Sequence, residues 1–206
     1  MDAFTSGKDS TGMPEEFDTG TTTVGMVADG GVVLATDQRA SLGGRFVSNK
    51  DAEKIFEVHP TAAITISGGV GDGQAFAKQL RVQTSLYETR RGREMSMEAL
   101  STTAANVIRG MRVVPLLGGV DDTGGHLFSL DPAGGLMEDT YGATGSGMQL
   151  AYGLLEQEFE EGMSMEDAES LAVRAVQSAS ERDTASGNGV VVARITSDGV
   201  EITEVQ

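Results

Sequence analysis

Cysteine is absent from the 206-residue chain, and histidine occurs at only two positions, His59 and His126. A chain without cysteine forms no disulfides, builds no zinc–thiolate sites and offers no cysteine nucleophile. Neither histidine belongs to a His-Glu-x-x-His pattern or lies in a motif typical of a Ser-His-Asp triad. The sequence therefore argues against a histidine-dependent catalytic site.

Long hydrophobic runs are also absent. No apolar stretch approaches the roughly 20 residues needed to cross a bilayer. Residues 1–8 lack the apolar core of a signal peptide. We therefore expect a cytoplasmic protein that does not bind a membrane.

Basic residues are scarce: 15 Lys and Arg stand against 31 Asp and Glu, for a formal net charge of −16. Such a surface repels nucleic acids and anionic membranes, because binding to phosphates needs Lys and Arg. Salt relieves the self-repulsion of a highly acidic protein. The composition favours a halophile's cytoplasm, with an ordinary acidic protein as the alternative. Lysine is rarer than Arg and occurs only at Lys8, Lys50, Lys54 and Lys78.

Glycine, in contrast, is abundant, with 28 residues. The run at residues 68–73 does not match G-x-G-x-x-G, and the chain contains no G-x-x-x-x-G-K-[ST]. The sequence therefore predicts no nucleotide-phosphate loop, and we expect no cofactor and no metal.

The chain divides into a short polar segment and one domain. Residues 1–20 are rich in Asp, Glu, Ser, Thr and Gly without apolar periodicity, which predicts a flexible tail. Two β-branched runs, at residues 21–27 and 31–36, follow with a Gly-rich turn between them and predict a hairpin. Further apolar patterns predict strands at 62–67, 112–117, 125–130, 135–141, 189–195 and 200–204.

Helices are predicted in two pairs. Residues 75–87 and 96–111 form the first pair, and 146–161 and 164–182 the second, with Ser96 and Ser164 as N-caps. Paired helices disfavour a doubly wound fold and favour an α+β fold with antiparallel sheets between helical layers. The apolar face of the first helix is predicted to comprise Phe76, Leu80, Gln83 and Tyr87, flanked by Ala75, Gln79, Val82 and Leu86.

The polar tail meets the first strand at Gly20 and Thr21. A threonine hydroxyl is a poor nucleophile without a base. An N-terminal threonine carries its own base, because its α-amino group has a pKa of roughly 7.7–8.0. That amine exists only after the bond between Gly20 and Thr21 is cut. From these residues alone, ordinary strand threonines are the alternative.

The chain from Thr21 to its end resembles the β subunits of the archaeal proteasome, in the N-terminal-nucleophile hydrolase superfamily. The resemblance covers nearly all of residues 21–206 and implies a four-layer αββα sandwich. Together with the acidic composition, it favours a haloarchaeal source. It implies that residues 1–20 are a propeptide removed autocatalytically. The motifs that carry the resemblance are weak singly and strong together in this order: residues 20–25, 35–39, 53–56, 67–72, 117–121, 142–147 and 182–187.

The resemblance also implies roles for individual residues. Thr21 matches the nucleophile, and Gly20–Thr21 is the cleavage site. Asp37 matches the acidic partner of a catalytic lysine, and Lys54 matches that lysine. Gly68 matches the backbone donor of the oxyanion hole. Three further residues match the group around the α-amine, namely Ser146, Asp183 and Ser186.

One departure affects the lysine. The stretch between Asp37 and Lys54 is one residue longer than the family pattern, and we expect a turn at residues 43–44 to absorb the difference. Lys50 lies only four residues before Lys54 and remains the alternative.

The same resemblance implies a first specificity pocket whose residues are all apolar. Such a pocket favours large apolar side chains before the cut bond, which is a chymotrypsin-like preference. The implied partners are proteasome α subunits and other β subunits, in four stacked seven-membered rings with 28 subunits, together with a regulatory ATPase and unfolded protein substrates. A catalytically silent ring subunit and another hydrolase of the superfamily, such as the bacterial two-ring protease or an amidase, remain alternatives. The predicted pocket residues are Ala40, Ala52, Phe56, Ile66 and Val70.

Overall fold

The computed structural model describes residues 20–205, which form two five-stranded antiparallel sheets and a small hairpin. The first sheet has the order β10 (Tyr141–Gly145), β1 (Thr22–Ala28), β2 (Gly31–Asp37), β11 (Val190–Thr196) and β12 (Gly199–Val205). The second has the order β5 (Ile55–His59), β6 (Ala62–Thr65), β7 (Leu116–Asp121), β8 (Gly124–Leu130) and β9 (Leu136–Asp139). The hairpin pairs β3 (Ala40–Leu42) with β4 (Phe46–Asn49).

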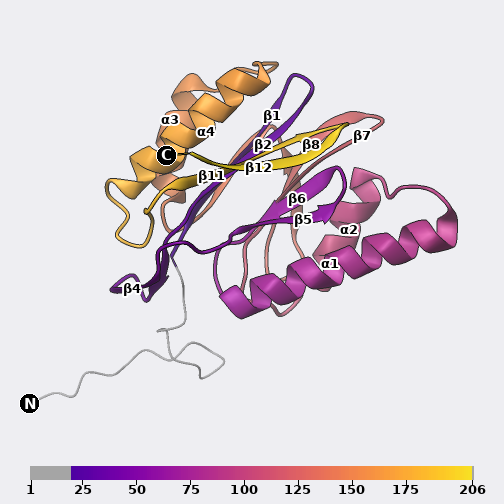
Figure 1. Cartoon of the computed structure of the whole chain (residues 1–206), viewed down its shortest axis with the longest axis horizontal. Helices are drawn as coiled ribbons and strands as arrows, with labels where there is room; N and C mark the ends of the chain where they lie inside the picture. The colour runs from indigo at the N-terminus through magenta and orange to yellow at the C-terminus, as the bar shows by residue number, and fades with distance from the viewer. Residues whose placement is uncertain (1–19, 206) are drawn as a thin grey trace, which may run out of the picture.

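Two pairs of helices cover the outer faces of the sheets: α1 (Val70–Arg91) with α2 (Met97–Val107), and α3 (Met148–Glu158) with α4 (Met165–Ser180). Figure 1 shows α3 and α4 on one side of the strands and α1 and α2 on the other. The predicted four-layer αββα sandwich is therefore confirmed.

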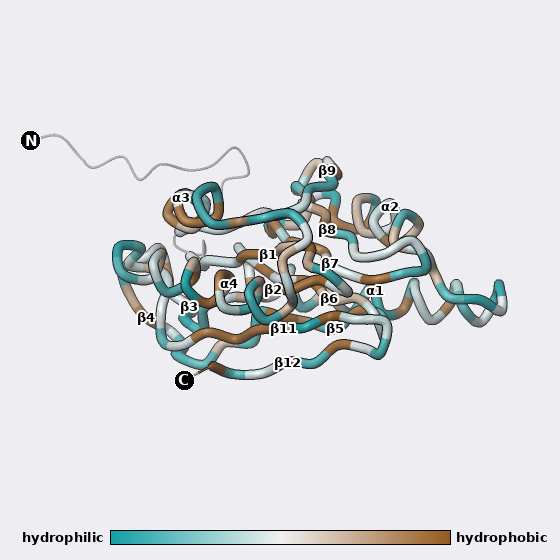
Figure 2. The backbone as a smooth tube through the Cα atoms, turned by 90° about the horizontal axis from the view of Figure 1, so that it is seen from above, coloured by the Kyte–Doolittle hydropathy of each residue, from teal (hydrophilic) through white to brown (hydrophobic). Residues whose placement is uncertain are grey.

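Apolar side chains fill all three spaces between the four layers. Figure 2 shows hydrophobic segments along the inner strands, while hydrophilic segments dominate the turns. Val32, Leu34 and Leu127 are buried between the two sheets. The outer interfaces are packed in the same way, around Phe76 under α1 and α2 and around Leu171 under α3 and α4. This burial is the main source of stability for such a sandwich.

Local signals placed several element ends correctly. The Ser96 side chain accepts a hydrogen bond from the Ala99 amide, and Ser164 accepts one from Asp167, so both predicted N-caps are confirmed. The predicted face of the first helix is partly wrong. Val82 and Leu86 are exposed there, because the buried face turns toward Phe76, Leu80, Ala77 and Thr84.

Two predicted strands are also wrong in position. The strand predicted at 112–117 begins only at Leu116, because Pro115 has no N–H to donate to the ladder. The run at 135–141 is divided between β9, in the second sheet, and β10, in the first, so the chain changes sheets there. Four strands were not predicted from the sequence as separate elements, namely β3, β4, β5 and β10.

The predicted propeptide lies outside the described residues, apart from Gly20. Among residues 20–205, none of the helices combines the length and apolarity that crossing a membrane requires.

Candidate active site

Thr21 precedes β1 and is 2% exposed. Its backbone N–H donates to Ser146 Oγ over 3.1 Å, and its hydroxyl donates to the Gly20 carbonyl oxygen over 2.7 Å. Ser146 is close because β1 pairs with β10, with Thr22 opposite Gly145. The hydroxyl of Thr21 thus lies against the peptide group that precedes it.

Asp37 ends β2 and is fully buried, yet four donors surround its carboxylate. Lys54 Nζ donates over 2.8 Å and the Thr22 amide over 3.0 Å, both to Oδ1. The amides of Arg39 and Gly187 donate to Oδ2, over 3.0 and 2.9 Å. These four donors provide hydrogen bonds to both oxygens of the buried carboxylate.

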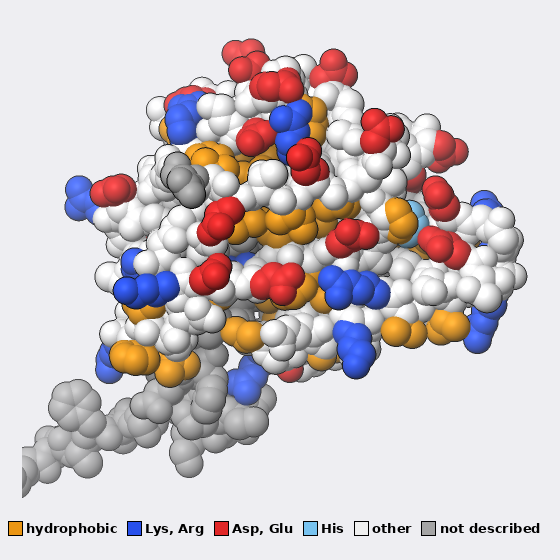
Figure 3. Space-filling view, in the orientation of Figure 1, with side chains coloured by type: hydrophobic (Ala, Val, Ile, Leu, Met, Phe, Trp, Pro, Cys, Tyr) orange, Lys and Arg blue, Asp and Glu red, His pale blue; other side chains and the backbone are white. Residues whose placement is uncertain are grey.

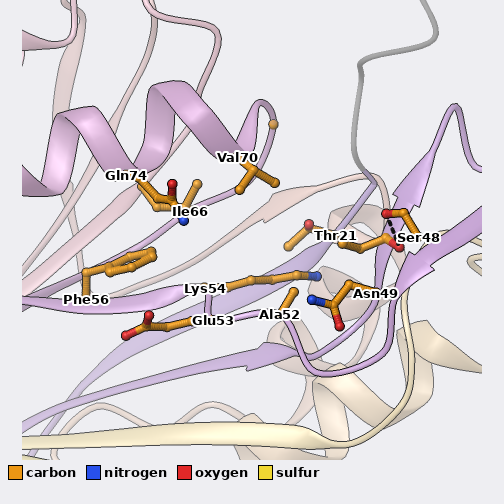
Figure 4. A pocket seen from close by; sticks show the side chains of 12 residues that line it. Thr21, Ser48, Asn49, Ala52, Glu53, Lys54, Phe56, Ile66, Val70 and Gln74 are labelled. Atoms are coloured by element: carbon orange, nitrogen blue, oxygen red, sulfur yellow. Dashed lines mark hydrogen bonds between the residues drawn. The ribbon is translucent and has the colours of Figure 1, made fainter.

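Lys54 directly precedes β5 and is 7% exposed. Burial lowers the pKa of the Lys54 ammonium below its usual value, and the neighbouring Asp37 opposes this shift. Figure 4 shows the Lys54 side chain extending toward Thr21. Lys50 is exposed, so the structure brings Lys54 rather than Lys50 to Asp37. Gly43 and Gly44 have positive φ in the turn between β3 and β4, at the place where the sequence predicts a turn.

A chain of hydroxyl groups converges on Asp183, in the loop between α4 and β11. Ser146 Oγ and Ser186 Oγ each donate to Asp183 Oδ2 over 2.6 Å. A charged carboxylate only accepts hydrogen bonds. Ser146 therefore accepts from the Thr21 amide, and Ser186 accepts from Thr22 Oγ1 over 2.7 Å. The structure thus brings the three predicted residues Ser146, Asp183 and Ser186 into one hydrogen-bonded group, in which Ser146 contacts the nitrogen of Thr21.

Gly68 lies between β6 and α1, with φ of +106°. A Cβ there would come within 2.5 Å of the Arg112 carbonyl oxygen. Both the left-handed backbone and this close approach therefore require glycine. Gly68 and Thr21 line the same cavity.

That cavity measures about 230 Å³. Pockets that enclose a whole drug-sized ligand measure roughly 300–1,000 Å³, so this one suits a single side chain. Figure 4 shows several of its lining side chains between the hairpin, β5 and α1. All five residues predicted for the specificity pocket line it, namely Ala40, Ala52, Phe56, Ile66 and Val70.

Sequence reasoning missed several residues of the site. Four polar residues also line the cavity, namely Ser48, Asn49, Glu53 and Gln74, and Glu53 is an exposed carboxylate. Thr22 extends the chain of hydroxyls to Asp183. Arg39 holds the loop that carries Asp183, through the Thr184 carbonyl at 2.9 Å. The one local signal for Arg39 is its position two residues after Asp37, the last residue of β2.

Within residues 20–205, no group of three His, Cys, Asp or Glu side chains is placed to hold a metal ion. His59 bonds to Glu88 and Thr61, and His126 bonds to Glu138, so both rings are engaged outside the cavity.

Two antiparallel sheets between two helix pairs, with the first strand beginning at the cavity, define the class of N-terminal-nucleophile hydrolases. Residues 17–195 match the family model described as proteasome subunit. The chain belongs to this family.

Several similar proteins come from halophilic archaea. Proteasome subunit beta 2 of Haloterrigena turkmenica is 59% identical over 187 residues, which cover 89% of this chain and 79% of that protein. Proteasome subunit beta of Halorhabdus utahensis is 60% identical over 189 residues, covering 90% and 81%. Proteasome subunit beta of Halobacterium salinarum is 59% identical over 185 residues, covering 88% and 76%.

Proposed function

We propose that the chain is the precursor of a proteolytic β subunit of the proteasome core particle. It acts as a threonine endopeptidase whose nucleophile is Thr21 once residues 1–20 have been removed. The observation that carries this proposal is the 2.7 Å contact between the Thr21 hydroxyl and the Gly20 carbonyl, next to a buried lysine.

Removal of residues 1–20 is a self-cleavage. Thr21 Oγ1 attacks the Gly20 carbonyl carbon and gives up its proton, the bond from that carbon to the Thr21 nitrogen breaks, and the nitrogen takes up a proton to leave as an amine. Water then hydrolyses the ester to a Gly20 carboxylate and a free Thr21 hydroxyl. Before cleavage the Thr21 nitrogen is an amide and has no useful basicity. Lys54 is therefore the proton acceptor, and its lowered pKa suits that role.

Peptide hydrolysis uses the same groups. The freed α-amine of Thr21 takes the proton from the attacking Thr21 hydroxyl and passes it to the leaving amine, while it stays beside Ser146 with Asp183 behind it. The Lys54 ammonium favours the deprotonated hydroxyl in the transition state, as any close opposite charge does. The Gly68 amide donates to the developing oxyanion, where a glycine lets the backbone approach closely.

The cavity beside Thr21 binds the side chain that precedes the cut bond. Its five apolar residues favour large apolar side chains, which gives a chymotrypsin-like preference. Glu53 on the wall of the cavity is expected to permit slower cleavage after basic residues, because an exposed carboxylate attracts them only weakly.

The protein works in the cytoplasm as part of a 28-subunit barrel, in two β rings of seven between α rings, with a regulatory ATPase feeding unfolded chains. The names of the similar proteins support the β assignment. Exposed large apolar side chains such as Phe46 (65%) and Met137 (66%) are typical of surfaces that other subunits cover.

The test is the intact mass of the chain after co-expression with the α subunit of its host. We expect the wild-type chain to lose residues 1–20 and to hydrolyse peptides, and Thr21→Ala to keep the full mass and show no activity. Thr102→Ala, an exposed threonine in α2, is the matched control and should mature normally. A mature chain that begins at another residue, or an active Thr21→Ala particle, contradicts the proposal.

A further inference from the structure

The loop that carries Asp183 also forms a wall against Gly20. A Cβ built on Gly20 would lie 1.9 Å from the Ala185 Cβ, 3.3 Å from its Cα and 2.9 Å from Ser146 Oγ. Carbon atoms in contact normally stay about 3.5–4.0 Å apart. Any side chain at position 20 must therefore displace the backbone at the bond to be cut.

The need for glycine at this position is steric. The three atoms nearest the ideal Cβ all lie within 3.3 Å, and two of them belong to Ala185. The constraint at position 20 comes from the neighbouring atoms, and above all from the methyl group of Ala185.

The wall cannot easily retreat. Ala185 is 3% exposed, and its amide donates to Asp183 Oδ1 over 3.2 Å. The preceding carbonyl, of Thr184, accepts from Arg39 Nη1 over 2.9 Å. The Thr184 hydroxyl donates to the Gly44 carbonyl over 3.3 Å, which ties this loop to the β3–β4 turn. A larger residue at position 20 would therefore have to shift its own backbone, and its carbonyl oxygen would lose the hydrogen bond from the Thr21 hydroxyl.

We propose that Ala185 is a steric wall beside the bond to be cut, which restricts the residue before that bond to glycine. This inference rests on the proposed function above. It also explains which bond is cut in a run of three threonines: the hydroxyls of Thr22 and Thr23 bond to Ser186 and Thr144. Of the three, Thr21 has its hydroxyl against the preceding carbonyl, and the residue before it has no Cβ.

The test is a rescue experiment on the full-length chain co-expressed with its α subunit. The rate of conversion from precursor to mature chain is followed by intact mass. Gly20→Ala should slow conversion by about 100-fold, the effect of moving reacting atoms by on the order of 1 Å. Adding Ala185→Gly to Gly20→Ala should raise the conversion rate at least about tenfold over that of Gly20→Ala alone, because the nearest clash is removed.

Two controls make the rescue specific. Ala185→Gly alone should mature, and Gly20→Ala combined with Ala143→Gly, a buried alanine in β10, should remain as slow as Gly20→Ala. A second series leaves Ala185 untouched: Ala, Ser and Val at position 20 should slow conversion in order of their size.

The outcomes separate the two proposals. A wild-type chain that keeps residues 1–20 contradicts the proposed function itself. A wild-type chain that matures, together with no rescue by Ala185→Gly or equal rates across the position-20 series, contradicts only the role of Ala185. Rescue in the double variant with graded rates in the series supports it.

Discussion

Replacing Lys54 by alanine should have two effects that can be measured separately, a loss of folding stability and a loss of catalytic rate. The change leaves the fully buried Asp37 carboxylate without its charged partner. Removing one member of a buried ion pair typically costs about 3–5 kcal/mol. Three backbone N–H groups still donate to Asp37, so we expect the lower end, about 3 kcal/mol. For a chain of this length that is a Tm decrease of roughly 6–12 °C.

The chemical effect should be much larger. Loss of the proton acceptor should reduce the rate of self-cleavage by about 10²–10⁴-fold, and loss of the ammonium should slow peptide hydrolysis as well. Self-cleavage should suffer more than peptide hydrolysis, because the Thr21 nitrogen is an amide until the bond is cut. The assay therefore needs two forms of Lys54→Ala: the full chain, followed by intact mass, and a chain produced to begin at Thr21, followed with a fluorogenic peptide.

The pH dependence gives an independent measure. A lysine accepts a proton only when neutral, so the rate of self-cleavage should rise with pH toward the pKa of Lys54. Burial lowers that pKa, so the midpoint of the rate increase should lie at a pH below the usual lysine pKa of roughly 10.4. Lys54→Arg should remove this rise, because a guanidinium stays charged and is larger.

Lys50→Ala is the matched control, because Lys50 is exposed and should be dispensable. Near wild-type hydrolysis by Lys54→Ala that begins at Thr21, or an inactive Lys50→Ala, would refute this reasoning.

Two further outcomes are expected. Peptides ending in Leu, Tyr or Phe should be cleaved faster than peptides ending in Arg, and Glu53→Gln should slow the Arg peptides further; faster cleavage after Arg in the wild type would contradict the pocket assignment. Gel filtration across a salt series should show large active particles in molar salt and small inactive species in dilute buffer. Loss of residues 1–20 removes five acidic residues and one lysine, so the net charge changes from −16 to −12. The repulsion between such acidic subunits acts over about 10 Å at 0.1 M salt but over only about 3 Å at 1 M. Stable active particles in dilute buffer would contradict this adaptation. Figure 3 shows Asp and Glu side chains spread over the visible face, from the α3 and α4 side across the strands.

Local sequence patterns predict the elements whose signals are local. The hairpin of β1 and β2, both serine caps and the order of the helix pairs depend on residues close together in the chain. The strand β10 has no such signal, because Gly142, Ala143 and Gly145 have low strand propensity. It forms through pairing with β1, more than 110 residues earlier, where Val24 lies opposite Ala143.

The site shows the same division. No spacing in the sequence indicates that Ser146 lies 3.1 Å from the Thr21 nitrogen, across 125 residues. Family resemblance supplied that expectation, and it also named the five apolar residues of the pocket. It did not supply Glu53 or Ala185, because their effects depend on which way a side chain faces in this chain.

Asp37 connects the fold to the chemistry. One carboxylate accepts from the start of β1 through the Thr22 amide, from the loop after α4 through the Gly187 amide, and from Lys54. Lys54 and the peptide group that joins Thr21 to Thr22 are therefore held by the same atom, Oδ1. Truncating Lys54 removes one of these contacts, whereas truncating Asp37 releases the start of β1, the loop with Asp183 and the lysine together. A site arranged in this way keeps its nucleophile and its proton acceptor in register, because neither can shift without disturbing the hydrogen bonds of the other.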